Sequence, residues 1–185
     1  EGLEKADKII AVSNYTKSMI TRYYMIPPEK IEVVYNAVEK NELEGFDGSL
    51  KSNSNKIVLF MGRLTLQKGP DYFIEAAHRV LQILPETKFV IAGSGEMYPR
   101  IVNRAAELGI ARNVLFTGHL TGRDVDMAYK MADLYVMPSV SEPFGITPLE
   151  ALRNNTPVII SKQSGVSEVL NNALKVDFWD INEMT

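Results

Sequence analysis

Residues 57–84 read IVLFMGRLTLQKGPDYFIEAAHRVLQIL, and this stretch predicts a strand, a loop and a helix in that order. Residues 57–61 are all apolar, as expected for a strand that is buried on both faces of a parallel sheet. From Pro70 onward, apolar residues recur at the spacing of a helix that packs one face against a core. A strand followed by such a helix is the repeating unit of an α/β fold.

The same alternation continues along the chain. Short apolar runs predict further strands at residues 88–92, 114–117, 134–137, 158–161 and 174–177. Apolar stripes at helical spacing predict helices at residues 70–84 and 97–108. Because each strand is nearly all apolar, helices should cover both faces of the sheet. We therefore predict an α/β fold with a parallel sheet of about six strands.

Residues 1–36 are predicted to form a separate unit. A strand at residues 8–12 precedes a helix that Ser13 caps and that the next two prolines stop. A second strand follows at residues 31–35. This unit has its own strand–helix–strand pattern ahead of the main sheet.

Residues 37–55 are rich in Gly, Ser and Asn and poor in apolar residues, which predicts a linker or an exposed loop. Residues 56–185 then form the α/β domain. Since the sequence begins at Glu1 and ends in a polar stretch without a closing helix, we expect it to be a fragment of a longer protein.

Composition excludes several classes of function. The 185 residues include 20 Lys or Arg and 23 Asp or Glu, so this slightly acidic chain has no general attraction to nucleic acid, and we expect no such partner. With no Cys and two isolated His, a disulfide framework and a thiolate nucleophile are excluded and no metal site is expected. No apolar run reaches the roughly 20 residues that cross a bilayer, and nothing resembles a secretory signal, so the cytoplasm is the expected location.

Ligands of open parallel α/β sheets bind beyond the carboxyl ends of the strands, which makes the strand-to-helix loops the place to look for a site. The first loop, residues 62–69, places Arg63 and Lys68 beside the start of a helix. Free N–H groups and two cations there favour a phosphate. The loop is not a P-loop, because Gln67 and Gly69 stand where that motif has Gly and Ser or Thr. Two solvated surface cations remain the alternative.

The second loop contains Gly93, Ser94 and Gly95 but has Tyr98 where a dinucleotide-binding fingerprint has its third glycine. No acidic residue follows the next strand, so a nicotinamide cofactor is disfavoured and a tight turn near a ligand remains. The third loop contains His119, which is more often a loop histidine than a catalyst.

The fourth loop runs from residue 138 to residue 147 and carries two glutamates eight residues apart, Glu142 and Glu150. Pro148 suits the first position of a helix, which predicts Thr147 as the N-cap and Glu150 as its partner in a capping box. That box is a complete structural explanation for Glu150 and competes with a functional one.

Glu142 has no such local explanation and is the better candidate for contact with a ligand. Gly145 lets the backbone approach a ligand closely, and the N–H groups of Ile146 and Thr147 offer a second anion site.

The loops thus contain, in order, Gly62-Arg63-Leu64 with Lys68-Gly69, Gly93-Ser94-Gly95, and Ser141-Glu142-Pro143-Phe144-Gly145 running into Pro148-Leu149-Glu150-Ala151-Leu152. This combination resembles the retaining glycosyltransferases of the two-domain GT-B type, the group 1 family with an E-x7-E motif. Residues 6–13 and 30–38 also resemble the segment that connects the two domains of that family. Ala37 and Glu39 depart from it, because the family more often has Gly and Asp there.

The resemblance implies that the chain is the nucleotide-sugar-binding half of a GT-B fold, with a Rossmann-like sheet between two helix layers. The acceptor-binding half would precede Glu1, and the final helix of the family would lie beyond Thr185. The implied activity is hexosyl transfer from a nucleoside-diphosphate sugar, such as a UDP-sugar, to a sugar, glycan or lipid acceptor. No cofactor or metal is implied, and peripheral membrane association is left open.

The resemblance also implies roles for individual residues. The donor diphosphate would be held by Arg63, Lys68, Ile146 and Thr147. The transferred sugar would be contacted by Glu142, in the catalytic position, and by Phe144 and Gly145. The ribose would be bound by Glu150, and the base would lie near Gly93, Gly95, Met97, His119 and Leu120.

Three other functions are alternatives to glycosyl transfer. Glycoside hydrolysis by the carboxylate pair is disfavoured, because a hydrolase has no need for a cationic loop at a helix start. A nucleotide-sugar epimerase of the same fold and a non-catalytic nucleotide-binding module remain alternatives. If the acceptor half is missing, the 185-residue chain should transfer no sugar by itself.

Overall fold

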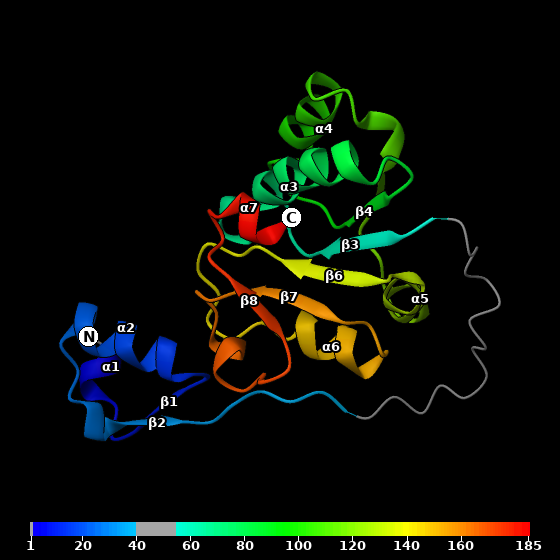
Figure 1. The fold of residues 1–185 in the computed structure, drawn as a ribbon. Coiled ribbons are helices and arrows are strands. Elements are labelled where there is room, and N and C mark those ends of the chain that lie inside the picture. Colours follow the sequence, from blue (N-terminus) through cyan, green and yellow to red (C-terminus); the bar gives the residue numbers. More distant parts are fainter. Residues whose placement is uncertain (1, 40–54) are drawn as a thin grey trace.

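The computed structural model describes residues 2–39 and 55–185, and Figure 1 shows their arrangement. The predicted linker at residues 37–55 lies mostly outside these described residues. None of the helices in the described ranges combines the length and the apolar character that crossing a bilayer requires.

The N-terminal unit is a two-stranded parallel sheet with its helices. It contains α1 (Gly2–Lys5), β1 (Ile9–Ala11), α2 (Asn14–Tyr24), a short 3-10 turn η1 (Pro28–Lys30) and β2 (Ile31–Val33). The Ser13 hydroxyl accepts a hydrogen bond from the Thr16 N–H at 2.9 Å, so the predicted N-cap is confirmed. The helix ends before the prolines, at Met25, which has a left-handed conformation.

The main sheet has six parallel strands, as predicted. They are β3 (Ile57–Met61), β4 (Lys88–Ala92), β5 (Val114–Gly118), β6 (Leu134–Met137), β7 (Val158–Ser161) and β8 (Leu174–Val176). Their spatial order is β5-β4-β3-β6-β7-β8. The chain therefore builds outward from β3 in one direction and then, after crossing over, from β6 in the other, which is the doubly wound Rossmann order.

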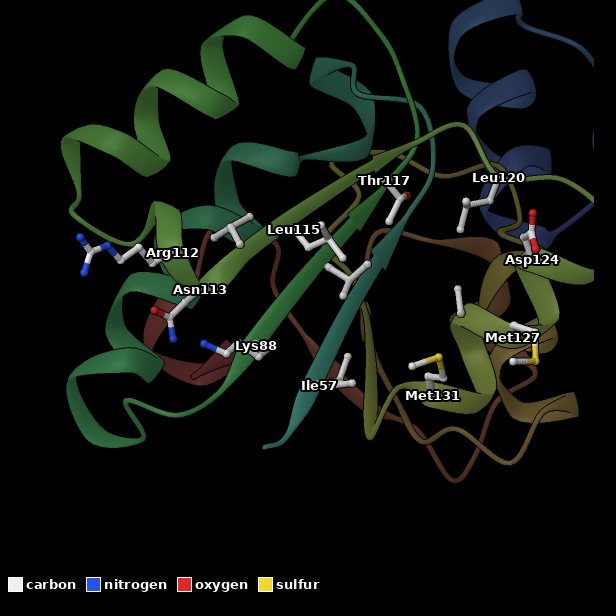
Figure 2. A pocket seen from close by; sticks show the side chains of 13 residues that line it. Ile57, Lys88, Arg112, Asn113, Leu115, Thr117, Leu120, Asp124, Met127 and Met131 are labelled. Carbon is white, nitrogen blue, oxygen red and sulfur yellow. The ribbon is translucent and has the colours of Figure 1, made fainter. Parts of the chain in front are cut away.

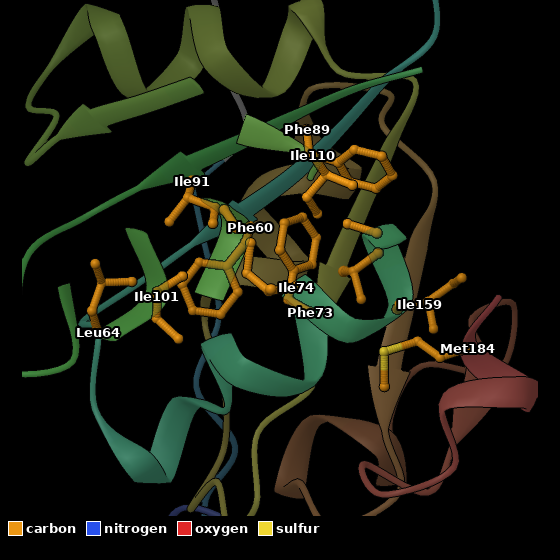
Figure 3. Close-up of a cluster of buried hydrophobic side chains, with 14 of the residues drawn as sticks. Phe60, Leu64, Phe73, Ile74, Phe89, Ile91, Ile101, Ile110, Ile159 and Met184 are labelled. Atoms are coloured by element: carbon orange, nitrogen blue, oxygen red, sulfur yellow. The ribbon is translucent and has the colours of Figure 1, made fainter. Parts of the chain in front are cut away.

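Helices cover both faces of this sheet (Figure 1). One face carries α3 (Pro70–Ile83), α4 (Tyr98–Glu107) and α7 (Ile181–Met184), and the other carries α5 (Arg123–Met131) and α6 (Thr147–Arg153). Strand β3 shows why, because Val58 and Phe60 face the first set of helices while Leu59 and Met61 face the second. Figure 3 shows the aromatic and aliphatic side chains of the first core, in which Phe73 lies between Phe60 and Phe89.

The strand order creates a crevice at one edge of the sheet. Since β3 and β6 are neighbours whose following helices leave to opposite faces, their carboxyl ends flank the switch point of the sheet. Ligands of doubly wound folds bind at this point. The loops after β3 and β6 are residues 62–69 and 138–146, the two loops that carry the predicted cations and carboxylates.

Candidate functional site

A cavity of about 300 Å³ opens at the carboxyl ends of β3 and β4. It brings together five residues that the sequence placed in the site, which are Arg63, Gly93, His119, Leu120 and Glu150. The remaining lining comes from the adjoining strand ends and from α5, namely Met61, Gly62, Ala92, Ser94 and Val125. Three different loops and α6 therefore converge on one space.

The glycines of the second loop allow it to pack against the first loop. A Cβ on Gly93, whose φ is +144°, would lie 1.8 Å from the Gly62 carbonyl oxygen, and one on Gly95 would lie 2.4 Å from the Leu64 carbonyl oxygen. The Leu64 N–H donates to the Ser94 carbonyl at 2.9 Å. The loops brace one another, which explains these glycines without a ligand.

Two predicted base-region residues lie beside the cavity and do not line it. Met97 is buried in the core under α4, and its N–H donates to the Leu64 carbonyl at 3.0 Å. Gly95 is held against the same carbonyl. Their contribution to the site is to hold the backbone of the first loop, while Gly93, His119 and Leu120 border the space itself.

Arg63 and Glu150 are the two charged side chains of the cavity lining. Arg63 is exposed, and no hydrogen bond or ion pair links its guanidinium to another described residue. Glu150 is half-buried and accepts a hydrogen bond from the Tyr129 hydroxyl at 3.0 Å. Burial raises the pKa of Tyr129 well above its ordinary value, and the neighbouring Tyr135 and Glu150 raise the pKa further. The Tyr129 hydroxyl therefore stays protonated and fixes the Glu150 carboxylate.

The predicted capping box at the start of α6 is wrong. The helix begins at Thr147 after Ile146, no side chain caps it, and Pro148 is its second residue. The Thr147 hydroxyl instead accepts a hydrogen bond from the Tyr135 hydroxyl at 2.8 Å, and Glu150 bonds to Tyr129. Two buried tyrosine hydroxyls, which need partners inside the protein, take the oxygens that the box would have used.

A second group of predicted residues lies where the loops after β3 and β6 meet. Lys68, at the end of the 3-10 turn η2 (Leu66–Lys68), forms an ion pair with Glu142, whose side chain is only 9% exposed. The Ser139 hydroxyl contacts the same carboxylate at 3.4 Å. Gly69 makes the close approach possible, because a Cβ there would lie 2.2 Å from the Pro138 carbonyl oxygen.

The turn into α6 completes this second group. Gly145, at a φ of +98°, packs against Met137 and the stem of Glu142. The N–H groups of Ile146 and Thr147 have no acceptor within the described residues. Phe144 is 2% exposed and belongs to the core beneath α5 and α6, so its side chain supports the turn from below.

The two groups adjoin at Gly62. This glycine lines the cavity beside Arg63, and a Cβ on it would touch the Lys68 methylenes at 4.0 Å. Beneath them, the Tyr135 hydroxyl lies between the Met61 carbonyl at 3.3 Å and the Thr147 hydroxyl at 2.8 Å. Lys68 and the start of α6 therefore adjoin the cavity through Gly62 and Tyr135, whereas Arg63 lines the cavity itself.

Tyr129 and Tyr135 are parts of the site that the sequence analysis missed. Both are fully buried and their rings pack edge to face. Tyr135 could have been found from the sequence, because its hydroxyl is a polar group within the apolar run of β6. Tyr129 is the buried residue of α5, and its hydroxyl is likewise a polar group on the apolar face of that helix. A buried tyrosine needs a partner for its hydroxyl, and here the partners are residues of the crevice.

A larger cavity of about 600 Å³ lies elsewhere, between α5 and the surface of β3, β4 and β5 (Figure 2). Its lining is mainly apolar, as Val90, Leu115 and Met127 illustrate, and it shares only Leu120 with the crevice. It does not contain the charged side chains predicted for the site. Within the part of the chain that the structure describes, no group of three or more His, Asp or Glu side chains is arranged to hold a metal ion.

A doubly wound sheet with an arginine, a lysine and two carboxylates at its switch point has its charged side chains where ligands of such folds bind. Residues 43–176 match the family described as Glycosyl transferases group 1, and residues 1–42 match the family described as Glycosyltransferase Family 4. The chain therefore belongs to the group 1 glycosyl transferases.

Relatives and solved structures agree with this family. An uncharacterized glycosyltransferase of Methanocaldococcus jannaschii is 35% identical over 175 residues, which are 89% of this chain and 45% of that protein. A D-inositol 3-phosphate glycosyltransferase of Segniliparus rotundus is 30% identical over 189 residues, 95% of this chain and 42% of that protein. The chain thus spans less than half the length of these curated relatives.

The fold is that of GT-B glycosyltransferases. The crystal structure of Anabaena HepE in complex with UDP and glucose superposes with a TM-score of 0.82 at 20% identity, over 97% of this chain and 52% of that one. The predicted Rossmann-like α/β fold with a six-stranded parallel sheet is confirmed.

Proposed function

We propose that this chain is the donor-binding half of a retaining glycosyltransferase that moves a hexose from a nucleoside-diphosphate sugar to an acceptor. The observation that carries the proposal is the cavity lined by Arg63 and Glu150, which the Lys68–Glu142 pair adjoins through Gly62. A UDP-sugar is the first donor to test, because the solved structure of Anabaena HepE contains UDP.

In this proposal Arg63 binds the diphosphate. Its guanidinium is exposed at the cavity rim and is free of carboxylate partners among the described residues. An unpaired guanidinium can offer two parallel N–H donors to phosphate oxygens. Lys68 binds the same phosphates after it leaves its ion pair with Glu142. The N–H groups of Ile146 and Thr147, which have no acceptor among the described residues, donate to the phosphates as well.

Glu150 binds the ribose. The Tyr129 hydroxyl fixes one carboxylate oxygen, so the group enters the cavity as a preorganised acceptor for sugar hydroxyls. The base then lies toward Gly93, His119 and Leu120, with Gly95 and Met97 bracing the loop beside it.

Glu142 contacts the transferred sugar, and Gly145 gives the sugar access to the backbone of the turn above Phe144. Breaking the bond between sugar and phosphate moves negative charge onto the diphosphate. Fixed cations and N–H donors at that place stabilise the transition state, and they supply this stabilisation without a metal. Retention of configuration belongs to the proposal through the family resemblance of the Glu142–Glu150 motif.

The acceptor, a sugar, glycan or lipid, would bind largely through a partner domain outside this sequence. The chain by itself is then expected to bind donor and to transfer nothing. A cytoplasmic location, with or without peripheral contact with a membrane, stays a prediction.

The proposal is tested first by thermal shift of the purified chain with UDP, GDP and ADP. A nucleotide that binds only the folded state raises the melting temperature. At a concentration a hundredfold above its dissociation constant, it increases the free energy of unfolding by about 2.7 kcal/mol. The parent should respond to one of the three, and Arg63→Ala should respond less. No shift with any nucleotide would refute the donor site.

The reaction is tested in the full-length protein by analysing products with and without an acceptor. A transferase releases nucleoside diphosphate and forms a new glycoside only when the acceptor is present. An epimerase alters the sugar without an acceptor, and a non-catalytic module leaves the sugar nucleotide intact.

A further inference from the structure

The first turn of α2 is bonded to the loop that carries Glu142. The Pro143 carbonyl oxygen accepts hydrogen bonds from the Ser13 hydroxyl at 2.5 Å and from the Thr16 hydroxyl at 3.0 Å. The Tyr15 and Ser141 hydroxyls are 3.0 Å apart. These bonds span more than a hundred residues of sequence and join the N-terminal unit directly to the candidate site.

Glu168 is the group that holds this turn in place. One of its carboxylate oxygens accepts the Tyr15 N–H at 2.6 Å, and the other accepts the Asn14 N–H at 2.9 Å, the Asn14 amide at 3.0 Å and the Tyr35 hydroxyl at 3.0 Å. Partial burial opposes its ionisation, but these hydrogen bonds outweigh burial and lower the pKa of Glu168. The carboxylate thus satisfies N–H groups that the start of α2 would otherwise leave open.

Glu168 is also the last residue of the segment 163–168, whose backbone is hydrogen-bonded to Glu142. It closes the 3-10 turn η4 (Gly165–Glu168). The Glu142 N–H donates to the Gln163 carbonyl and the Gly165 N–H donates to the Glu142 carbonyl, both at 3.0 Å. The Glu142 backbone is therefore fixed to the segment before Glu168, while the neighbouring Pro143 is fixed to the helix that Glu168 holds.

This packing leaves little room for adjustment. Ser13 is fully buried, and a Cβ on Gly165 would lie 2.4 Å from the Ser13 Cβ. The ring of Tyr35, whose hydroxyl bonds to Glu168, lies 6.1 Å from the ring of Phe144 in the same loop. A change at Glu168 would therefore reach the loop through contacts of the N-terminal unit with three loop residues, Ser141, Pro143 and Phe144.

We propose that Glu168 is a positioning residue for Glu142, holding the first turn of α2 against residues 141–144 so that the Glu142 carboxylate is set for the donor sugar. The inference rests on the proposed function for the role of Glu142. Glu168 does not line the cavity of Arg63 and Glu150, so its loss should affect the sugar and leave the nucleotide site intact.

The test compares Glu168→Ala and Glu168→Gln with the full-length parent. Glu107→Ala is the matched control, since Glu107 is an exposed carboxylate in an ion pair on α4. We expect Glu168→Ala to lower kcat by about tenfold to a hundredfold, because a small displacement of a catalytic group costs this much. Affinity for UDP should stay within about twofold, and Glu168→Gln, which keeps one acceptor oxygen, should lose less.

Hydrogen exchange tests the same variants without a measurement of enzyme activity. Hydrogen exchange of the peptide that contains residues 141–147 should become faster in Glu168→Ala and stay at the parent rate in Glu107→Ala. Tyr15→Phe, which removes only the contact with Ser141, should move exchange and kcat in the same direction by less.

The outcomes separate the two hypotheses. Unchanged exchange at residues 141–147 in Glu168→Ala would overturn the positioning role, whatever the activity. A parent that binds no nucleotide would refute the proposed function and leave the exchange result as the test of whether Glu168 holds residues 141–144 in place. Equal losses of UDP affinity and kcat would also overturn the inference, because they would indicate general damage to the fold.

Discussion

Replacing Arg63 by Ala should weaken the binding of a nucleoside diphosphate without weakening the fold. Arg63 is exposed and has no ion-pair partner among the described residues, so its removal takes away no internal contact and should change stability by less than about 0.5 kcal/mol. A hydrogen bond between charged groups contributes about 1.5 to 3 kcal/mol. The dissociation constant for the diphosphate should therefore rise about tenfold to 150-fold.

Titration calorimetry with UDP and with uridine distinguishes the role of Arg63 from a general effect on the cavity. The loss should appear with UDP and be nearly absent with uridine, which has no phosphate. Arg112→Ala is the matched control, because Arg112 is also exposed but lines the separate apolar cavity. Equal UDP affinity in the Arg63 variant and the parent would remove the phosphate assignment and with it the main support of the donor site.

Three further predictions concern the same crevice. Glu150→Gln should keep its hydrogen bond from Tyr129 and its melting temperature, yet lose about 1 to 2 kcal/mol of nucleotide affinity by calorimetry; unchanged affinity would leave Glu150 a purely structural partner of Tyr129. Gly93→Ala should lower the free energy of unfolding by at least about 2 kcal/mol in urea, because its Cβ would meet the Gly62 carbonyl at 1.8 Å. Gly109→Ala, at a φ of +72° with nothing within 4 Å, should lose less. Sugar transfer by the full-length protein should survive dialysis against EDTA, and a loss restored by Mg²⁺ would contradict the metal-free proposal.

The strands of the main sheet could be predicted from the sequence almost to the residue, whereas β1 and β2 are each two residues shorter than predicted. The runs at 57–61, 88–92, 134–137 and 158–161 have the same ends in the structure, and β5 and β8 differ by one residue. Strands buried on both faces must be apolar throughout, and polar loop residues interrupt that pattern sharply. The Ser13 cap was predicted for a similar reason, since it depends only on residues next to it in sequence.

The start of α6 could not be predicted in this way. Thr147 and Glu150 have the spacing of a capping box, but Tyr135 from β6 and Tyr129 from α5 compete for their oxygens. A local motif gives no information about donors that arrive from other elements. The same limit applies to Gly93, because the atom that excludes a side chain there is the carbonyl oxygen of Gly62, in a different loop.

The Lys68–Glu142 pair links the two halves of the proposed site. In the structure each group satisfies the other, and both are largely shielded from water, so an unpaired carboxylate at this place would be costly. A diphosphate in the crevice offers Lys68 a more strongly charged partner, and Glu142 then needs new donors. The hydroxyls of a sugar attached to that diphosphate would be such donors, whereas the only sugar hydroxyls of a free nucleoside diphosphate are on its ribose, which the proposal places at Glu150. On the proposed function, the site would therefore favour an intact sugar nucleotide over its nucleoside diphosphate. The exchange of partners would allow one buried pair to serve both the phosphate and the sugar.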